Sequence, residues 1–457
     1  MDTTRQSVLF PQLFDGKAVV AKFDQEHSSS DGGALLLKAV DEELGLSRRL
    51  AACIEDRRQP SKVQHELEEL LRQRMFGIAC GYADANDAAR IGDDPIQKLL
   101  AGRDPVVGES LASQPTLSRF ENRVRRGDLF RMGEALADLV IERHRRRLRG
   151  KARRITIDMD PTDDPTHGQQ ELAFYNGHYQ SWCYLPMVAN VTFGEEREQY
   201  LVAAVLRPGN AHASRGAIGL LRRLFQKLRA AFTKVRLRVR LDGGFATPEI
   251  FDFLEDEGVE YLVAMAKNKR LGPQGARLMA RARRESKRTG RSAAFFGETR
   301  YAARAWKRGK RRVIYKAEVV CLAGRTPRDN LRFVVTNLPH RPEHVHDIYR
   351  QRGDDENRIK ELHHGLEFDR TSCHRFLANQ LRILMTTAAY VWMQELRYRA
   401  RGTRFASAQV TKIREQLLKV AAWIEVSVRR IVVHLPRAFA AEADWMRIAA
   451  RLHATPG

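Results

Sequence analysis

The sequence has few cysteines, and none of them has the spacing of a metal site. The 457-residue chain contains five: Cys53, Cys80, Cys183, Cys321 and Cys373. Zinc sites use cysteine and histidine ligands in closely spaced pairs, and disulfide scaffolds concentrate many cysteines in a short chain. The sequence therefore argues against a zinc site and predicts a reduced, cytosolic protein.

Long hydrophobic runs are also missing. No uninterrupted apolar stretch is long enough to cross a bilayer. The N-terminal sequence MDTTRQSVLFPQLFDGKAVV lacks the basic start and apolar block of a secretory signal. We therefore expect neither a membrane partner nor secretion.

Acidic residues are scarce relative to basic ones. The chain has 79 Lys and Arg against 56 Asp and Glu, which gives a formal net charge of +23. Hydrophobic residues make up 43%, enough for real cores, and the length suggests two to four domains. A globular protein this basic usually binds a polyanion. Of the two candidates, nucleic acid and an anionic membrane surface, nucleic acid comes first and is the partner that we expect.

Residues 1–150 have mainly helical patterns. SKVQHELEELLRQRMFGIACGY, residues 61–82, has apolar residues at helical spacing after a serine. LASQPTLSRFENRV, residues 111–124, resembles the turn and second helix of a helix-turn-helix, although a plain packing helix has the same pattern. Residues 143–154, RHRRRLRGKARR, are a basic run that suits either phosphate contact or a solvated linker.

Strands and helices then alternate, which predicts an α/β domain. Strands are expected in RRITIDMDPTDD, CYLPMVANVTF, QYLVAAVLRPG and KVRLRVRLDGGF, and an amphipathic helix in SRGAIGLLRRLFQKLRAAF. Residues 271–340 have three further strand patterns, which predict a β-rich insertion. From residue 341 onward the patterns are helical, including residues 375–400 and 407–435.

Three aspartates fall at the ends of predicted strands. Asp158 and Asp160 share one face of the first strand because strand side chains alternate, and Asp242 ends another. Sites in open α/β sheets gather at strand ends, and converging carboxylates suit Mg²⁺. Two such ions serve phosphodiester chemistry. The alternative is that each aspartate only caps a turn.

The stretch YRQRGDDENRIKELHHG, residues 349–365, is rich in both charges. A single helix would bring four side chains to one face: Tyr349, Arg352, Glu356 and His363. Glu356 would then complete a carboxylate triad, with Arg352 able to hold a phosphate or to orient Glu356. The remaining acidic residues, Asp354, Asp355 and Glu361, are expected to be solvated. A salt-bridged surface helix is the alternative reading.

These motifs together resemble one family. The spacing Tyr349-(2)-Arg352-(3)-Glu356 is similar to the Tyr-Arg-Glu-Lys signature of DDE insertion-sequence transposases. Four motifs, in this order, resemble its bacterial 1380-type group: DMDPTDDPTHGQQE, LRPGNAH, LDGGF and YRQRGDDENRIKE. The likeness extends to RRQPSKVQHELEELLRQRMFGIACGYADANDAARIGDDP near the N-terminus.

The resemblance implies a ribonuclease-H-like catalytic core with a β-strand insertion between the second Asp and the Glu. The chain then divides into a helical DNA-binding domain, a first core part, the insertion, a second core part with the catalytic Glu, and a C-terminal helical region: 1–150, 151–270, 271–340, 341–395 and 396–457. It also implies acidic ligands at Asp160, Asp242 and Glu356, with Tyr349 and Arg352 near the cleaved phosphate.

Some assignments stay open within this resemblance. Asp160-Pro161-Thr162 fits the Asp-x-Thr habit of the family, but Asp158 has the same side-chain phase. The signature Lys falls at His363, so either His363 or Lys360 takes that role, or neither does. His167 either contacts a phosphate or is a turn residue without a role in the site. Trp306 either stacks on a base or packs within its own sheet.

The implied function is a DNA transposase with Mg²⁺ or Mn²⁺, two ions being expected. It would bind terminal inverted repeats, cleave DNA and join a 3′-hydroxyl to target DNA, as a dimer when DNA is bound. The implied location is the bacterial cytoplasm, on the nucleoid when bound to DNA. The alternatives are a catalytically silent DNA-binding protein and a metal-dependent DNA nuclease.

Overall fold

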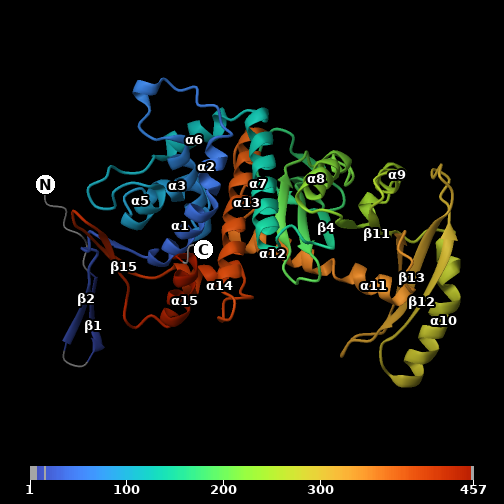
Figure 1. The fold of residues 1–457 in the computed structure, drawn as a ribbon. Helices are drawn as coiled ribbons and strands as arrows, with labels where there is room; N and C mark the ends of the chain where they lie inside the picture. Colours follow the sequence, from blue (N-terminus) through green and yellow to red (C-terminus); the bar gives the residue numbers. More distant parts are fainter. Residues whose placement is uncertain (1–7, 15–16, 454–457) are drawn as a thin grey trace.

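The computed structural model describes residues 8–14 and 17–453 and has an elongated shape. A helical region lies at one end, a large mixed sheet in the middle, and a helix with long strands at the other end (Figure 1). Over those described ranges, no helix is long and apolar enough to cross a membrane. The class expected from the sequence, a mixed α/β protein, is confirmed.

The central sheet has eight strands in the order β12-β13-β14-β11-β10-β4-β8-β9. Its middle strands are β4 (Arg154–Pro161), β8 (Met187–Phe193), β9 (Tyr200–Val205), β10 (Arg236–Leu241) and β11 (Glu260–Met265). Strands β4, β8 and β9 are antiparallel neighbours, whereas β4, β10 and β11 run parallel. Strand β8 is buried along its whole length, because helices cover both faces of the sheet.

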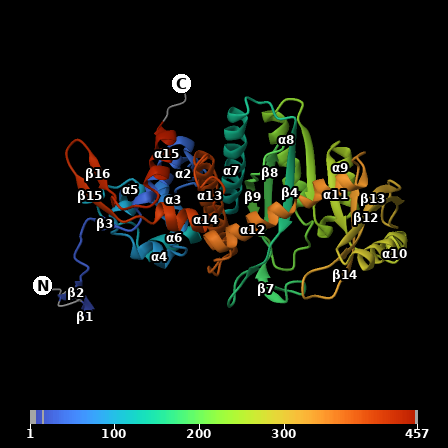
Figure 2. The ribbon, with the colours of Figure 1, turned by 90° about the horizontal axis from the view of Figure 1, so that it is seen from below.

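Helices connect and cover these strands. They are α8 (Ala217–Ala231), α9 (Pro248–Asp256), α7 (Arg126–Arg147), α11 (Pro342–Arg350), α12 (Gly353–Leu366) and α13 (Phe376–Arg399). Both α7 and α13 contact β9. Figure 2 shows α11 and α12 running across the sheet strands. The long helix α13 is buried almost throughout, so it joins the sheet to the N-terminal helices.

The N-terminal region contains the predicted helices together with a hairpin that was not predicted. Its helices are α1 (Leu35–Leu44), α2 (Leu46–Ala51), α3 (Leu67–Cys80), α4 (Ala85–Arg90), α5 (Pro95–Ala101) and α6 (Gln114–Arg123). Helix α3 begins at Leu67 rather than near Ser61, because Pro60 starts a short 3₁₀ turn. Strands β1 (Val8–Phe14) and β2 (Lys17–Ala21) form the hairpin.

The insertion has the three predicted strands, β12 (Ala293–Tyr301), β13 (Arg311–Val320) and β14 (Arg328–Thr336). A helix not predicted from the sequence, α10 (Leu271–Thr289), precedes them and packs on β12 and β13. Strand β14 pairs with β11, so the insertion continues the central sheet.

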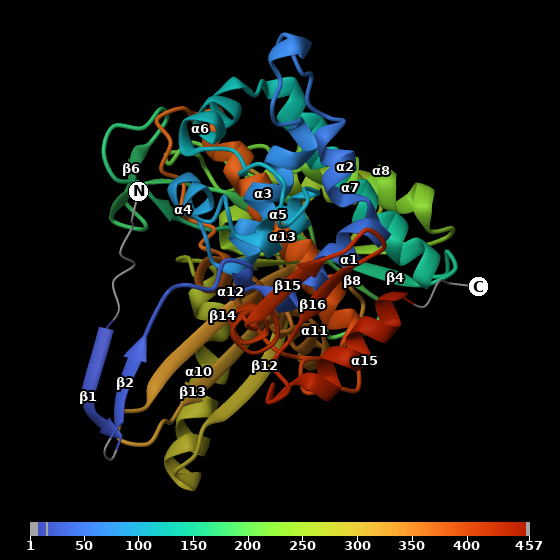
Figure 3. The same cartoon turned by 90° about the vertical axis from the view of Figure 1, so that its left-hand side faces the viewer.

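The prediction of a helix over residues 407–435 is wrong for most of that range. Only α14 (Val410–Ile413) and one π-helical turn (Arg414–Leu418) are helical. Strands β15 (Ala422–Val426) and β16 (Ile431–His434) follow and pair with each other, and β15 also pairs with β3 (Ser28–Ser29). In WIEVSV, residues 423–428, every second residue is β-branched, which favours a strand over the helix that the apolar spacing predicted. The last helix is α15 (Glu442–His453), seen beside β15 and β16 in Figure 3.

A small sheet extends from the end of β4. It consists of β5 (Asp164–Pro165), β7 (Ser181–Tyr184) and β6 (Phe174–Asn176). Strand β5 follows β4 after two residues, so this sheet lies close to the end of β4.

Candidate active site

Strands β4 and β10 bring Asp160 and Asp242 to the same end of the sheet. In their parallel register Arg240 pairs with Asp158 and Leu241 with Met159, so Asp242 comes next to Asp160. The Oδ1 atom of Asp242 accepts a hydrogen bond of 2.9 Å from the Gly244 amide, so Asp242 caps the 3₁₀ turn formed by Gly243–Phe245. Both carboxylates therefore stand at the carboxyl edge of parallel strands, where sites in such sheets gather.

The first turn of α12 supplies the third carboxylate, Glu356. Arg352 forms an ion pair with Asp160, and its Nη1 atom lies 3.3 Å from Glu356 Oε1. The Tyr349 hydroxyl donates a hydrogen bond of 3.4 Å to the Leu241 carbonyl, just before Asp242. The single helix expected over this stretch is instead two helices that break at residues 351–352.

Burial and neighbouring charges shift the pKa of two residues at this site, Asp160 and Tyr349. Burial raises the pKa of Asp160 to about 7; the charges of Asp242 and Glu356 add to this rise, and Arg352 opposes it. Burial also raises the pKa of Tyr349 to about 12, with all three carboxylates contributing. We call Asp160, Asp242 and Glu356 the carboxylate site. At Asp160, burial and the two neighbouring negative charges oppose ionisation, and a nearby cation offsets this effect.

Asp158 is fully engaged within the protein. Its side chain is 0% exposed. Its Oδ1 and Oδ2 atoms accept hydrogen bonds of 2.7 and 2.6 Å from Arg240, and Gln199 donates a further bond of 2.9 Å. Arg240 also donates to the Ile348 carbonyl and to Gln351. The Asp158–Arg240 pair thus fastens the α11–α12 junction to the sheet.

Two acidic residues that were expected to be solvated are buried, which corrects that expectation. Asp355 is 0% exposed and accepts a bond of 2.7 Å from Asn190 on β8. Glu361 accepts bonds from Tyr390, Arg397 and the Val410 amide. Asp354, by contrast, is exposed as expected. One face of α12 packs against the sheet and α13, and charged residues on this face are paired.

The other residues singled out from the sequence lie in different surroundings. The Nε2 atom of His363 lies 3.0 Å from Thr162 Oγ1, and its Nδ1 atom 3.4 Å from Asp369. Lys360 and His167 are exposed. Trp306 lies in the loop between β12 and β13, is only 6% exposed and packs edge-on against Phe251 of α9 and Tyr301 of β12. Its ring is therefore packed inside the protein, although not within its own sheet alone.

The donor set suits a hard divalent cation, but a protein cation takes that place here. Among residues 8–14 and 17–453 no group of three or more His, Cys, Asp or Glu side chains is close enough to hold a metal ion. The guanidinium of Arg352 lies between Asp160 and Glu356 instead. Oxygen-only ligands select Mg²⁺ or Mn²⁺, so the chemistry of these three donors suits such an ion, although their spacing in this structure does not yet hold one.

Two exposed basic surfaces lie apart from the carboxylate site. Leu117 and Phe120 bury one face of α6, while Arg119 and Arg123 are exposed beside a cavity of about 570 Å³. Helix α10 presents a row of exposed basic side chains: Arg277, Arg281, Arg284, Lys287 and Arg288. Both surfaces suit phosphate contacts.

The basic run at residues 143–154 is partly structural. Arg143 pairs with Glu395 at 2.7 Å and Arg147 with Glu196 at 2.7 Å. His144 is buried between Phe193 and Tyr200. Arg145, Arg146 and Arg149 remain exposed.

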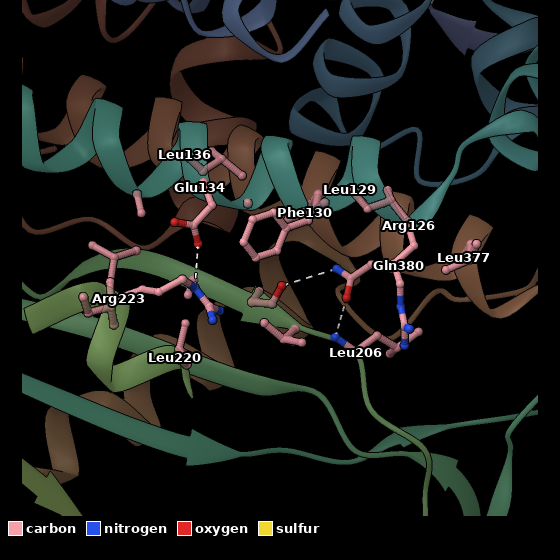
Figure 4. Close-up of a pocket in the computed structure, with 18 of the residues that line it drawn as sticks. Arg126, Leu129, Phe130, Glu134, Leu136, Leu206, Leu220, Arg223, Leu377 and Gln380 are labelled. Carbon is pink, nitrogen blue, oxygen red and sulfur yellow. Dashed lines mark hydrogen bonds and ion pairs between the residues drawn. The ribbon is translucent and has the colours of Figure 1, made fainter. Parts of the chain in front are cut away.

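An apolar cavity of about 230 Å³ lies between α7, α8, β9 and α13 (Figure 4). Its wall includes Leu129 and Leu220, with the Glu134–Arg223 ion pair at 3.0 Å. Gln380 bonds to Leu206 and Ala204 and so completes the backbone pairing of β9. None of the carboxylate-site residues lines this cavity.

Sequence reasoning missed the residues that support the site. Arg240, Gln199 and Asn190 hold buried carboxylates, yet each lies in a strand or loop with no motif. Arg240 was open to prediction, because strand side chains alternate and Arg240 therefore lies on the same face as Asp242. The other polar residues of that strand are also arginines.

One of three comparisons with known proteins identifies the family of this chain. A search of curated proteins found no match. A solved structure described as a cryo-EM structure of the piggyBac transposase synaptic complex with hairpin DNA is similar at 12% identity and a TM-score of 0.39, over 85% of this chain and 80% of that chain. The family described as Transposase DDE domain group 1 matches residues 11–456, nearly the whole chain. The protein therefore belongs to the DDE transposase family.

Proposed function

We propose that this protein is a bacterial insertion-sequence transposase of the 1380-type group that cleaves DNA at terminal inverted repeats and transfers the 3′-hydroxyl to target DNA. The observation that carries the proposal is that Arg352 joins Asp160 to Glu356, while Asp242 ends the strand next to that of Asp160. Family membership supports the reaction class. The strand order β9-β8-β4-β10-β11, with carboxylates ending β4 and β10, supports a ribonuclease-H-like core.

Asp160, Asp242 and Glu356 would hold the divalent cations, Mg²⁺ or Mn²⁺, as two ions. Bound there, such ions activate an attacking oxygen and stabilise a leaving oxygen during in-line displacement at phosphorus. We favour Asp160 over Asp158 as the first ligand, because Arg240 and Gln199 occupy the Asp158 oxygens.

Arg352 has two roles in this proposal. In the described structure it offsets the charge of Asp160 and Glu356. Once cations replace it, its guanidinium fork is free to hold a non-bridging oxygen of the scissile phosphate. Tyr349 anchors the end of β10 through the Leu241 carbonyl and so fixes the position of Asp242. Water and then a DNA 3′-hydroxyl are the nucleophiles, so no covalent protein–DNA intermediate is needed.

The described basic surfaces support DNA as the partner. Residues 1–150 would form the DNA-binding domain, with α6 and its basic cavity meeting the inverted repeat. Residues 151–270 and 341–395 would form the core, 271–340 the insertion, whose α10 adds phosphate contacts, and 396–457 a C-terminal region. Joining two element ends requires two copies, so we expect a dimer on DNA in the bacterial cytoplasm.

A cleavage assay on DNA carrying the flanks of the reading frame tests the proposal. Asp242→Ala and Glu356→Ala should each abolish strand cleavage with Mg²⁺ and leave salt-sensitive DNA binding in place. Asp354→Ala, an exposed neighbour on the same helix, is the matched control and should cleave normally.

Other outcomes select the alternatives. Normal cleavage by both variants would disprove the carboxylate site. Wild-type protein that binds but never cuts would be a silent DNA-binding protein. A protein that cuts but cannot join a 3′-end to target DNA would be a nuclease.

A further inference from the structure

The β6–β7 hairpin carries an exposed aromatic surface. Tyr175 and Trp182 pair directly across the two strands, so both point to the same face. They are 55% and 59% exposed. Their ring centroids lie 6.4 Å apart at an interplanar angle of 66°, so the rings meet edge to face. A face of the Trp182 indole therefore remains free to stack on another ring. We call residues 174–184 the aromatic hairpin.

The aromatic hairpin is held in place by the segment that follows β9. This segment is the motif LRPGNAH, residues 206–212, and Asn176 of the hairpin donates a hydrogen bond of 2.8 Å to its Gly209 carbonyl. A Cβ atom at Gly209 would lie 2.0 Å from the Cys183 carbonyl oxygen and 2.6 Å from that of Phe174, so only glycine fits this approach. Buried Arg207 binds the Leu185 and Ala213 carbonyls and fixes the motif. The surface is therefore pre-formed.

The aromatic hairpin lies beside the carboxylate site. Strand β4, which carries Asp160, continues into β5, and β5 pairs with β7. The Thr166 amide donates a bond of 2.9 Å to the Trp182 carbonyl, and the Thr162 amide binds the Pro186 carbonyl at 2.9 Å. Burial raises the pKa of the turn residue Tyr179 to about 12, and the charges of Asp163, Asp160 and Asp242 add to this rise. A DNA strand at the carboxylate site would thus pass close to the exposed rings.

We propose that Tyr175 and Trp182 form a stacking platform for an unpaired base of the DNA strand held at the carboxylate site. This inference rests on the proposed function. Bases inside a duplex have both faces covered, so only a base taken out of the stack can use the platform. Stacking is the contact suited to this position, because a flat ring needs no charge beside an acidic site, while phosphates are met by the basic surfaces elsewhere.

A binding experiment on single-stranded DNA tests the platform directly. Stacking tolerates any base, so a twelve-nucleotide oligothymidylate serves as the probe. Trp182→Ala should weaken binding about tenfold or more, whereas Trp182→Phe should restore most of it. The slope of log K against log salt should stay unchanged, because no phosphate contact is lost. Trp423→Ala is the control, since Trp423 is 45% exposed on β15, in a separate sheet (Figure 2).

The outcomes separate this inference from the proposed function. Asp242→Ala should abolish cleavage yet keep the Trp182-dependent part of oligothymidylate binding. If Trp182→Ala binds oligothymidylate like wild type while the wild type cleaves, the platform is wrong and the proposed function stands. If Trp182→Ala changes the oligomeric state in size-exclusion chromatography, the aromatic hairpin is a protein interface and the inference is overturned. If wild type never cleaves, the proposed function fails whatever the Trp182 result.

Discussion

Replacing Arg240 by methionine should destabilise the protein strongly, because it leaves Asp158 charged and buried without its partner. Arg240 and Asp158 are 3% and 0% exposed and joined by two hydrogen bonds of 2.6 and 2.7 Å. Breaking a buried pair by removing one partner costs about 3–5 kcal/mol. Arg240→Met also removes the bond to the Ile348 carbonyl at the start of the α11–α12 junction.

This cost converts into a measurable melting shift. An unfolding entropy of about 2.1 cal/mol/K per residue over 457 residues is about 1 kcal/mol/K, so a midpoint fall of roughly 3–5 °C is expected for cooperative unfolding. Differential scanning fluorimetry and the cleavage assay would be run together on three variants: Arg240→Met, Asp158→Asn and Asp160→Asn.

The variants at residues 158 and 160 separate a structural carboxylate from a reactive one. Asp158→Asn should lose stability, as Arg240→Met does. Burial raises the pKa of Asp160 to about 7 from 3.8, so its ionised form costs stability as pH rises through that range. Asp160→Asn should therefore stay close to wild type in stability at pH 8 while losing cleavage. An unchanged midpoint for Arg240→Met, or a stable but inactive Asp158→Asn, would refute this reasoning.

Three further outcomes are expected. Burial lowers the pKa of His144 to about 2 from 6.5, so the unfolded state binds the extra proton and stability should fall by about 2 kcal/mol between pH 6.5 and 5; denaturant titrations of His144→Gln should lack this part of the fall. Gly209→Ala should cost about 1–3 kcal/mol by overpacking and weaken oligothymidylate binding, whereas Gly258→Ala, with nothing within 4 Å of its Cβ but a φ of +62°, should change stability without changing that binding. Glu361→Gln should cost about 3–5 kcal/mol in the same titrations, because buried Arg397 loses its charged partner, and an unchanged midpoint would contradict the described pairing.

Strong periodicity made the sheet predictable from the sequence. The alternation in RLRVRL and in RITIDMDP gave the strands β10 and β4, and with them the position of Asp160 beside Asp242. Local pattern failed where two periods compete. WIEV suits both a helix and a strand, and pairing with Ser28 and Ser29, about 400 residues away in sequence, decides for the strand.

Burial of charge was the other property that the sequence did not reveal. Asp354, Asp355 and Glu356 are consecutive, yet they are exposed, fully buried and exposed in turn. Helix geometry fixes which of them share a face, but the partner of Asp355 is Asn190, on a distant strand. The sequence thus singled out Asp160, Asp242 and Glu356 as candidates, but it did not reveal the buried hydrogen bonds and ion pairs around them.

The pairing of β14 with β11 gives the insertion a mechanical property. Backbone hydrogen bonds join all eight strands from β12 to β9, and α10 packs on β12 and β13. Helix α10 and the aspartates of β4 and β10 therefore belong to one rigid unit. A DNA duplex bound by the arginines of α10 would lie at a fixed distance from the carboxyl ends of β4 and β10. Changing the length of β12 and β13 would then reset where along the duplex the reaction falls, with no change at the carboxylates themselves.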